Sequence, residues 1–246
     1  MSKRRIHWYK YASPQALYPL IVRGVRWFAI PAAILFIVGG YLALFVAPID
    51  FQQGDAYRVL FIHVPAAWMG MFLYILMAIY AGVGWAFNTR VSSMMASSIA
   101  RTGAMFTFLA LVTGSLWGKP AWGTWWVWDA RTTSTLILLF LYTGFMALQS
   151  AIEDYRRADR ACAVLAVVGV VNVPIIYFSV QWWNTLHQGA TIRIVNKSTI
   201  TPSMLAPMLI LLAACWLYSV AVVLTRLSCI IVERENWSVG PLERSS

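Results

Sequence analysis

The chain has 246 residues, of which 60% are hydrophobic and 11% are charged, and its formal net charge is +10. Soluble domains carry about 25% charged residues, so this composition excludes an ordinary soluble protein and indicates an integral membrane protein. The positive charge is therefore expected at a membrane surface and does not predict a nucleic-acid partner.

Six apolar segments are long enough to cross a bilayer, which takes about 20 residues. In chain order they cover residues 28–46, 58–87, 99–117, 133–152, 161–181 and 204–232. The predicted fold is an all-α integral membrane protein, a bundle of six transmembrane helices that forms one domain over residues 1–246. The basic N-terminus does not predict a cleaved signal peptide, because the first apolar segment begins far downstream and has full spanning length.

Lysine and arginine are distributed unevenly along these spans. Of the 19 basic residues, 14 lie toward the two termini and around the connections from span two to three and from span four to five. The positive-inside rule then predicts that both termini are cytoplasmic. Residues 117–131, which join spans three and four, are predicted to form an interfacial loop on the outer face.

The three cysteines, Cys162, Cys215 and Cys229, all fall within predicted helices. No cysteine lies on the outer side, so the sequence predicts neither a disulfide framework nor a dithiol for redox exchange there. The chain also has no CxxCH motif for covalent haem attachment and no P-loop. Any energy from ATP is therefore expected to come from another subunit.

The outer loop begins with WGKPAWGTWWVWD, which holds five of the 13 tryptophans: Trp117, Trp122, Trp125, Trp126 and Trp128. An aromatic belt places tryptophan at membrane interfaces, but a belt is spread around a protein and explains this concentration poorly. If the loop is helical, the residues that share one face are Trp122, Trp125, Trp126 and Asp129. Such a face offers a flat apolar surface to a large planar ligand.

Two histidines are predicted near the outer surface, on different helices. His63 lies at the outer end of span two, and His187 follows span five, whereas His7 is in the cytoplasmic tail. Zinc sites take three or four protein ligands, and the spacing of the outer aspartates does not require such a site. Haem needs only axial ligands, because its macrocycle supplies four nitrogens. Two histidines are sufficient for that.

Charged residues next to these groups are candidates for contacts with ligand carboxylates. Arg58 and Arg131 are expected to pair with such carboxylates through charge-assisted hydrogen bonds. Asp129 is expected either to orient Arg131 or a loop amide, or to cap the helix of span four, a role for which Thr132 and its neighbours compete.

The string WGTWWVWDAR resembles the tryptophan-rich WWD signature of the haem-handling family of bacterial c-type cytochrome maturation. The resemblance extends to FIHVPAAWMGM around His63 and to VNVPIIYFSVQWWNTLHQG around His187, and it covers most of the chain. Length and layout are similar to CcmC, the haem-transfer branch of that family, and differ from its much larger haem-lyase component.

This resemblance implies a function, a location and partners. His63 and His187 would be axial ligands of non-covalently bound haem b, and the loop tryptophans would hold its ring. The chain would lie in the bacterial inner membrane with its site on the periplasmic side, and it would deliver haem to the chaperone CcmE. The implied assembly also contains the ATPase CcmA, the membrane subunit CcmB and the small membrane protein CcmD. The chain itself would be a transfer protein, not an enzyme.

Two alternative functions stay open on the residues alone. A bis-histidine membrane cytochrome for electron transfer would use the same two ligands, although such haems usually lie deep between helices. A membrane carrier for an aromatic or cationic ligand would use the tryptophans as its binding surface, but it leaves the paired histidines unexplained.

Overall fold

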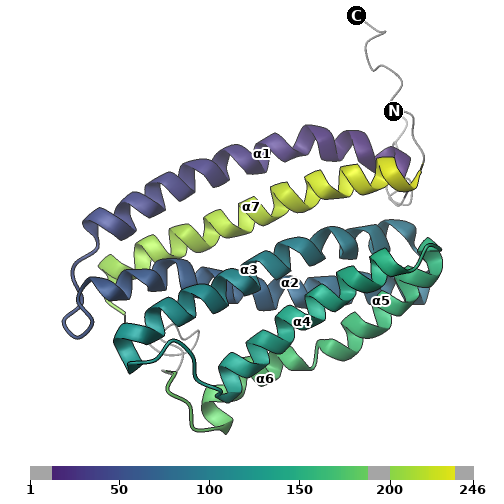
Figure 1. Ribbon diagram of the computed structural model, residues 1–246. Coiled ribbons are helices and arrows are strands. Elements are labelled where there is room, and N and C mark those ends of the chain that lie inside the picture. Colours follow the sequence, from purple (N-terminus) through teal and green to yellow (C-terminus); the bar gives the residue numbers. More distant parts are fainter. Residues whose placement is uncertain (1–12, 188–199, 236–246) are drawn as a thin grey trace, which may run out of the picture.

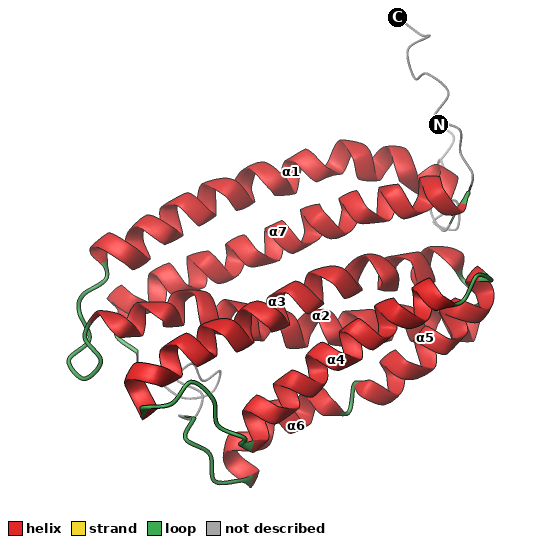
Figure 2. Ribbon diagram, viewed as in Figure 1, coloured by secondary structure: helices red, strands yellow, loops and turns green. Residues whose placement is uncertain are grey.

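The computed structural model describes residues 13–187 and 200–235, and its regular elements are helices (Figure 2). The main helices are α1 (Pro14–Tyr41), α2 (Leu60–Phe87), α3 (Arg90–Trp122), α4 (Ala130–Ala151), α5 (Tyr155–Gly169), α6 (Asn172–Trp182) and α7 (Pro202–Arg234). A π-helical turn, η2 (Leu42–Val46), extends α1, and a 3-10 turn, η3 (Asp55–Val59), leads into α2.

Six helical segments are long and apolar enough to cross a membrane, which confirms the predicted all-helical, six-span architecture. Several helices are longer than the apolar segments that predicted them. α1 begins at Pro14 instead of residue 28, with Ser13 as its N-cap, and α3 starts at Arg90 and continues to Trp122. Helical hydrogen bonding tolerates polar residues, so a helix continues past its apolar window until a cap or a breaker ends it.

The helices run roughly side by side (Figure 1). α1 and α7 lie along one side of the bundle, α2 and α3 occupy the middle, and α4, α5 and α6 lie on the other side. The start of α1 and the end of α7 share one end of the bundle with the α2–α3 and α4–α5 turns. The opposite end carries residues 47–54 and the tryptophan loop. That the first of these ends is the cytoplasmic one remains the prediction from the basic residues.

The centre of the bundle is packed with tyrosines against glycines. The hydroxyl of Tyr142 on α4 donates a hydrogen bond to the carbonyl of Gly70 on α2 at 2.8 Å. A Cβ atom at Gly103 of α3 would lie 2.1 Å from the same hydroxyl oxygen. Small residues at such crossings let membrane helices approach closely, so Gly103 sets the approach of α3 to α4.

The fifth span is two helices instead of the single one predicted for residues 161–181. α5 ends at Gly169, and α6 starts at Asn172. Pro174 has no N–H to donate to the carbonyl of Val170, and its ring would crowd that carbonyl in a continuous helix. Asn172 stabilises the break by donating a side-chain hydrogen bond to the carbonyl of Ser134 on α4 at 2.8 Å.

Candidate functional site

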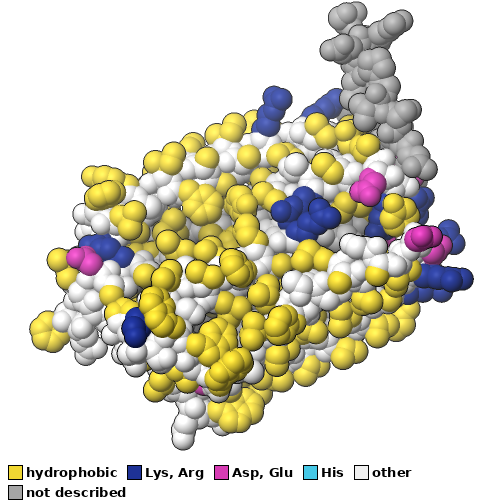
Figure 3. Space-filling view, viewed as in Figure 1, with side chains coloured by type: hydrophobic (Ala, Val, Ile, Leu, Met, Phe, Trp, Pro, Cys, Tyr) yellow, Lys and Arg dark blue, Asp and Glu magenta, His cyan; other side chains and the backbone are white. Residues whose placement is uncertain are grey.

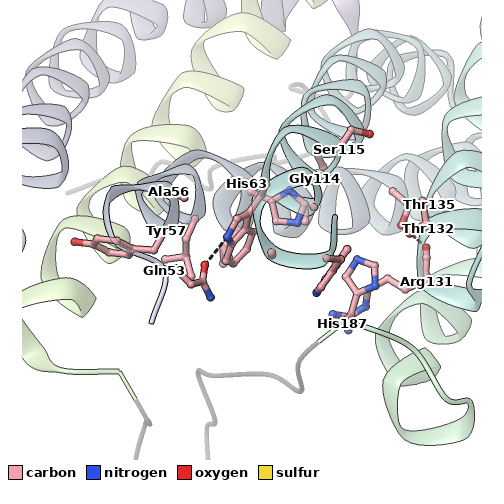
Figure 4. A pocket seen from close by; sticks show the side chains of 18 of the residues that line it. Gln53, Ala56, Tyr57, His63, Gly114, Ser115, Arg131, Thr132, Thr135 and His187 are labelled. Atoms are coloured by element: carbon pink, nitrogen blue, oxygen red, sulfur yellow. Dashed lines mark hydrogen bonds between the residues drawn. The ribbon is translucent and has the colours of Figure 1, made fainter. Parts of the chain in front are cut away.

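A cavity of about 1670 Å³ lies at the end of the bundle that carries the tryptophan loop (Figure 4). Its lining comes from α2, α3, α4, α6 and the start of α7, and from the segments before α2, between α3 and α4, after α6 and before α7. Seven of the ten residues predicted for the site line it: His63, Trp117, Trp122, Trp125, Trp126, Arg131 and His187. Pockets for drug-sized ligands occupy about 300–1,000 Å³, so this cavity has room for a ligand as large as a macrocycle.

The tryptophan loop is not a continuous helix, so the condition under which four of its residues would share one helical face is not met. α3 carries Trp117 and Trp122 and ends at Gly123, whose φ of 78° lies in the left-handed region that glycine adopts readily. The residues between Gly123 and α4 are not helical. Trp125 and Trp126 therefore reach the cavity from an irregular segment and not from the face of α3.

The imidazole of His63 is held by α3. Its Nδ1 lies 3.1 Å from Oγ1 of Thr113, and that hydroxyl lies 2.6 Å from the carbonyl oxygen of Leu109. A threonine hydroxyl has a single proton. With that proton donated to Leu109, the hydroxyl oxygen accepts from His63, so Nδ1 carries the hydrogen and Nε2 keeps a free lone pair.

Space for the His63 ring depends on a glycine in the neighbouring helix. A Cβ atom at Gly114 would lie 3.0 Å from Cε1 of His63, closer than ordinary contact. The edge of the ring also faces Trp117, at 5.8 Å between centroids. The Trp117 indole N–H donates to Oε1 of Gln53 at 2.7 Å, so the segment before α2 helps to orient the aromatic wall beside His63.

The imidazole of His187 is held by a carboxylate, whereas that of His63 is held by a hydroxyl. Its Nδ1 lies 2.8 Å from Oδ2 of Asp129, and the Asp129 side chain is only 6% exposed. A carboxylate accepts, so Nδ1 donates and Nε2 again keeps its lone pair. Trp122 packs edge-on to this ring at 4.8 Å between centroids.

Burial sets the charge state of the His187–Asp129 pair. Burial lowers the pKa of His187 below its usual 6.5, although the hydrogen bond that the ring donates to Asp129 opposes this shift. Burial by itself would raise the pKa of Asp129, but hydrogen bonds from the Thr132 amide and from His187 outweigh it and lower that pKa. At neutral pH the pair is therefore a neutral imidazole that donates to an ionised carboxylate.

Asp129 also organises the start of α4. Its Oδ1 accepts a hydrogen bond from the amide of Thr132 at 2.8 Å, which makes Asp129 the N-cap residue. The structure thus selects the capping role over the alternative in which Asp129 binds the Arg131 side chain. Asp129 does not line the cavity and contacts the site through His187.

Arg131 is positioned by a serine that the sequence did not single out. Its Nε donates to Oγ of Ser179 on α6 at 3.3 Å, and the Ser179 hydroxyl donates in turn to the carbonyl of Ile176 at 2.7 Å. Within residues 13–187 and 200–235, the two terminal nitrogens of Arg131 make no hydrogen bond. Ser179 is fully buried on a separate helix, so no local pattern identifies it as a partner of Arg131.

Two of the predicted site residues lie elsewhere. The Arg58 guanidinium binds Asp55 and the backbone carbonyls of Ala43 and Ala47, at 2.8, 2.6 and 3.1 Å. It connects the C-terminal end of α1 to the start of α2 and does not line the cavity. Trp128 is 74% exposed, does not line the cavity and packs against the ring of Trp126.

Two further observations restrict the kind of ligand that fits. Among the described residues, no three His, Cys, Asp or Glu side chains come together closely enough to hold a metal ion by themselves. The indole N–H of Trp126 is buried, and it has no hydrogen-bond partner among the described residues. A ligand that brings most of its own metal donors, and that carries hydrogen-bond acceptors, suits this set of residues.

The fold and the site together define a six-span helical membrane protein with a histidine- and tryptophan-lined cavity at one end of the bundle. The chain belongs to the CcmC family, described as heme exporter protein C, whose model matches residues 7–239. This finding confirms the resemblance drawn from the WWD, His63 and His187 motifs.

Individual relatives are similar over most of their length. The chain is 48% identical over 197 residues to heme exporter protein C of Escherichia coli strain K12, which covers 80% of this chain and 79% of that protein. It is 43% identical over 234 residues to heme exporter protein C of Bradyrhizobium diazoefficiens, covering 95% and 89%. It is 44% identical over 197 residues to a ccmC-like mitochondrial protein of cytochrome c biosynthesis from Marchantia polymorpha, covering 80% and 81%.

Proposed function

We propose that this protein handles haem in c-type cytochrome biogenesis and holds haem b non-covalently in the cavity, with His63 and His187 as its two axial ligands. One observation carries the proposal. Each imidazole has its Nδ1 engaged by a neighbouring acceptor, Thr113 or Asp129, and keeps Nε2 free. Metal-binding histidines commonly donate their second ring nitrogen to such a partner, which sets the tautomer and the ring orientation.

The other cavity residues suit the rest of a haem. Trp122, Trp125 and Trp126 supply aromatic surface for the apolar ring. The free guanidinium nitrogens of Arg131 and the indole N–H of Trp126 are donors for its carboxylates. Bringing four nitrogens of its own, haem needs no third protein ligand, in agreement with the lack of a larger metal-binding cluster among the described residues.

The two histidine ligands are unequal, which supports transfer over permanent storage. The ionised carboxylate of Asp129 increases the basicity of His187 more than the neutral hydroxyl of Thr113 increases that of His63. His187 is therefore the stronger proposed ligand and His63 the weaker one. We expect release to begin with the loss of the His63 bond, while His187 and the tryptophans still hold the ring.

The proposed setting follows from the family and from the distribution of charge. Relatives are named heme exporter protein C, a transport-type component and not a classical enzyme. We place the site on the periplasmic side of the inner membrane, with the chaperone CcmE as the acceptor of the haem. CcmA, CcmB and CcmD are the proposed subunits of the same complex. The ATPase CcmA would bind and hydrolyse ATP, for which this sequence has no P-loop.

The test is an absorption spectrum of the purified protein in its oxidised and reduced forms. We expect a six-coordinate haem spectrum that changes in His63→Ala and in His187→Ala, with His7→Ala as the unchanged control. Covalent haem on CcmE, measured in the same cells, should fall in both variants. A colourless protein from haem-replete cells, or identical spectra in all variants, would overturn the proposal. Haem that is bound normally but never reaches CcmE would favour the electron-transfer alternative.

A further inference from the structure

A pair of arginines lies far from the cavity, where α3 packs beside α7. Arg226 of α7 hydrogen-bonds Thr102, the residue next to Arg101 on α3, so the two basic side chains lie next to each other. Neither forms an ion pair with any carboxylate in residues 13–187 and 200–235. At the same end of the bundle Asp159 is paired with Arg234, and Glu235 is paired with Arg90.

The depth of this pair in the membrane points to the anion that it meets. At 1.5 Å per residue, Arg226 lies about 12 Å before the end of α7 and Arg101 about 16 Å after the start of α3. Each of these helices has 33 residues and is thus about 50 Å long, whereas the hydrocarbon core of a bilayer is about 30 Å thick. With the helices centred, about 10 Å at each end of each helix lies outside the core, so the backbones of Arg226 and Arg101 lie about 2 and 6 Å inside its edge. A long arginine side chain can span that depth to the lipid phosphates.

One arginine is fixed in place and the other is free. A terminal nitrogen of Arg226 donates to Oγ1 of Thr102 at 2.9 Å, and Thr102 is fully buried between the helices. Arg226 therefore cannot simply extend into water, as an isolated interfacial arginine does. Arg101 is exposed and makes no hydrogen bond to another described residue. Two like charges held this way are stabilised by an anion bound between them.

An apolar strip leads from the arginines toward the centre of the membrane. On α3, residues spaced four, seven and eleven positions after Arg101 share its face, and these are Met105, Phe108 and Val112. They are 37%, 58% and 39% exposed. On α7 the hydroxyl of Tyr218 contacts the sulfur of Met105 at 3.8 Å and closes one side of the strip. The space-filling view shows basic side chains over α3 and α7, with apolar side chains leading from them toward the tryptophan-loop end and an acidic side chain on the other side (Figure 3).

We infer that Arg101 and Arg226 bind the phosphate of an anionic phospholipid of the cytoplasmic leaflet, with one acyl chain along Met105, Phe108 and Val112. The guanidinium pair supplies the charge complementarity, and the exposed strip supplies the apolar contact. This lipid site is separate from the proposed haem site, which lies at the opposite end of the bundle, and it does not rest on the proposed function.

The experiment compares the wild-type chain with Arg101→Gln, which removes no hydrogen bond or ion pair among the described residues, and with the Arg101→Gln/Arg226→Gln double variant. The purified proteins are stripped of lipid in detergent and then given phosphatidylglycerol, phosphatidylcholine or inorganic phosphate. Bound lipid is counted by native mass spectrometry, and the unfolding midpoint is followed. The matched control is Arg156→Gln/Arg157→Gln, two exposed arginines beyond the same end of the bundle.

We expect phosphatidylglycerol to bind and to raise the unfolding midpoint of the wild type and of the control. Binding should weaken about ten-fold for each charge-assisted hydrogen bond lost. Phosphatidylcholine and inorganic phosphate should have little effect, the first because it carries no net charge and the second because it has no acyl chain. Equal lipid binding by all proteins would overturn the inference, and so would an equal response to inorganic phosphate. If the arginine variants bind lipid normally but no longer co-purify with another membrane subunit, the inference is also wrong. Arg101 and Arg226 would then bind a carboxylate of that subunit.

Discussion

Nδ1 of His187 lies 2.8 Å from Oδ2 of Asp129, and the other oxygen of that carboxylate accepts the amide of Thr132 at 2.8 Å. One side chain thus links the segment after α6 to the first turn of α4. The turn also carries Arg131, which is tied to α6 through Ser179. The proposed iron ligand and the proposed carboxylate-binding residue are therefore held in one framework, and several consequences can be measured.

Replacing Asp129 by Asn should weaken the site without unfolding it. Asparagine is as good an N-cap as aspartate, so α4 should keep its start, but His187 loses its charged partner. Loss of such a partner typically costs about 10–100-fold in metal affinity or activity, and the less basic ligand should shift the haem reduction potential to more positive values. Haem titration and potentiometry check this. Asp55→Asn, which alters only the contact with Arg58, should leave both quantities unchanged.

Acid should release haem through His187. Burial holds the pKa of His187 below 6.5, so the ring is neutral and able to ligate at pH 7. The neutral ring stabilises the folded chain above pH 6.5, the ordinary pKa, and this contribution is lost as the pH falls through the lower folded value. We expect haem absorbance to decline in that window. In Asp129→Asn the decline should move to lower pH, because the carboxylate favours protonated His187; a shift to higher pH contradicts the assignment.

The tryptophans of the loop should differ in importance. Trp122 packs against His187 and lines the cavity, whereas Trp128 is mostly exposed and does not line it. Burying a large apolar side chain contributes about 1.5–3 kcal/mol, so Trp122→Ala should weaken haem binding about 10- to 100-fold at about 1.4 kcal/mol per tenfold. Trp128→Ala is the matched control. Haem per protein, measured for both variants and for the triple Trp122, Trp125 and Trp126 alanine variant, separates a binding surface from an interfacial belt.

Gly103→Ala should destabilise the bundle. The added Cβ would lie 2.1 Å from the hydroxyl oxygen of Tyr142, inside the packed centre, and overpacking of this kind costs typically about 1–3 kcal/mol. Gly40→Ala adds the same atom to α1, where nothing lies within 4 Å. The midpoint of thermal unfolding in detergent should fall for the first variant and stay level or rise for the second. Equal midpoints would contradict the close crossing of α3 and α4.

The orientation in the membrane can be read from reporter fusions. A fusion after Arg131 should report the periplasm, and a fusion after Arg157 should report the cytoplasm, because 14 of the 19 basic residues lie toward the predicted cytoplasmic side. Arg131 lies in the first turn of α4, and Arg157 lies in the first turn of α5, beyond the other end of α4. The same signal from both fusions would contradict the predicted topology.

The sequence by itself determined the spans, the shared end of His63 and the tryptophan loop, and the family. Each of these properties depends on residues that are close together in the sequence, or on their order along the chain. The length of an apolar run is enough to identify a span, since a bilayer has a definite thickness, and alternate crossing then assigns every connection to one of two ends. One local feature was predicted wrongly, because the break before Pro174 was read as one continuous span. The sequence left open whether the tryptophan loop is helical, and in the structure Gly123 ends α3 within it.

Only the tertiary structure decided which atoms are available for chemistry. The contacts that hold His63, His187 and Arg131 join residues 50, 58 and 48 positions apart, and no spacing rule along the chain relates such pairs. The packing of α3 against α2 and of α6 against α4 selects Thr113, Asp129 and Ser179 from many similar side chains. The same packing turns Arg58 away from the cavity, toward the carbonyls at the end of α1. A free Nε2 on each histidine is a consequence of those helix contacts, because a ring nitrogen is committed only by the partner that lies next to it.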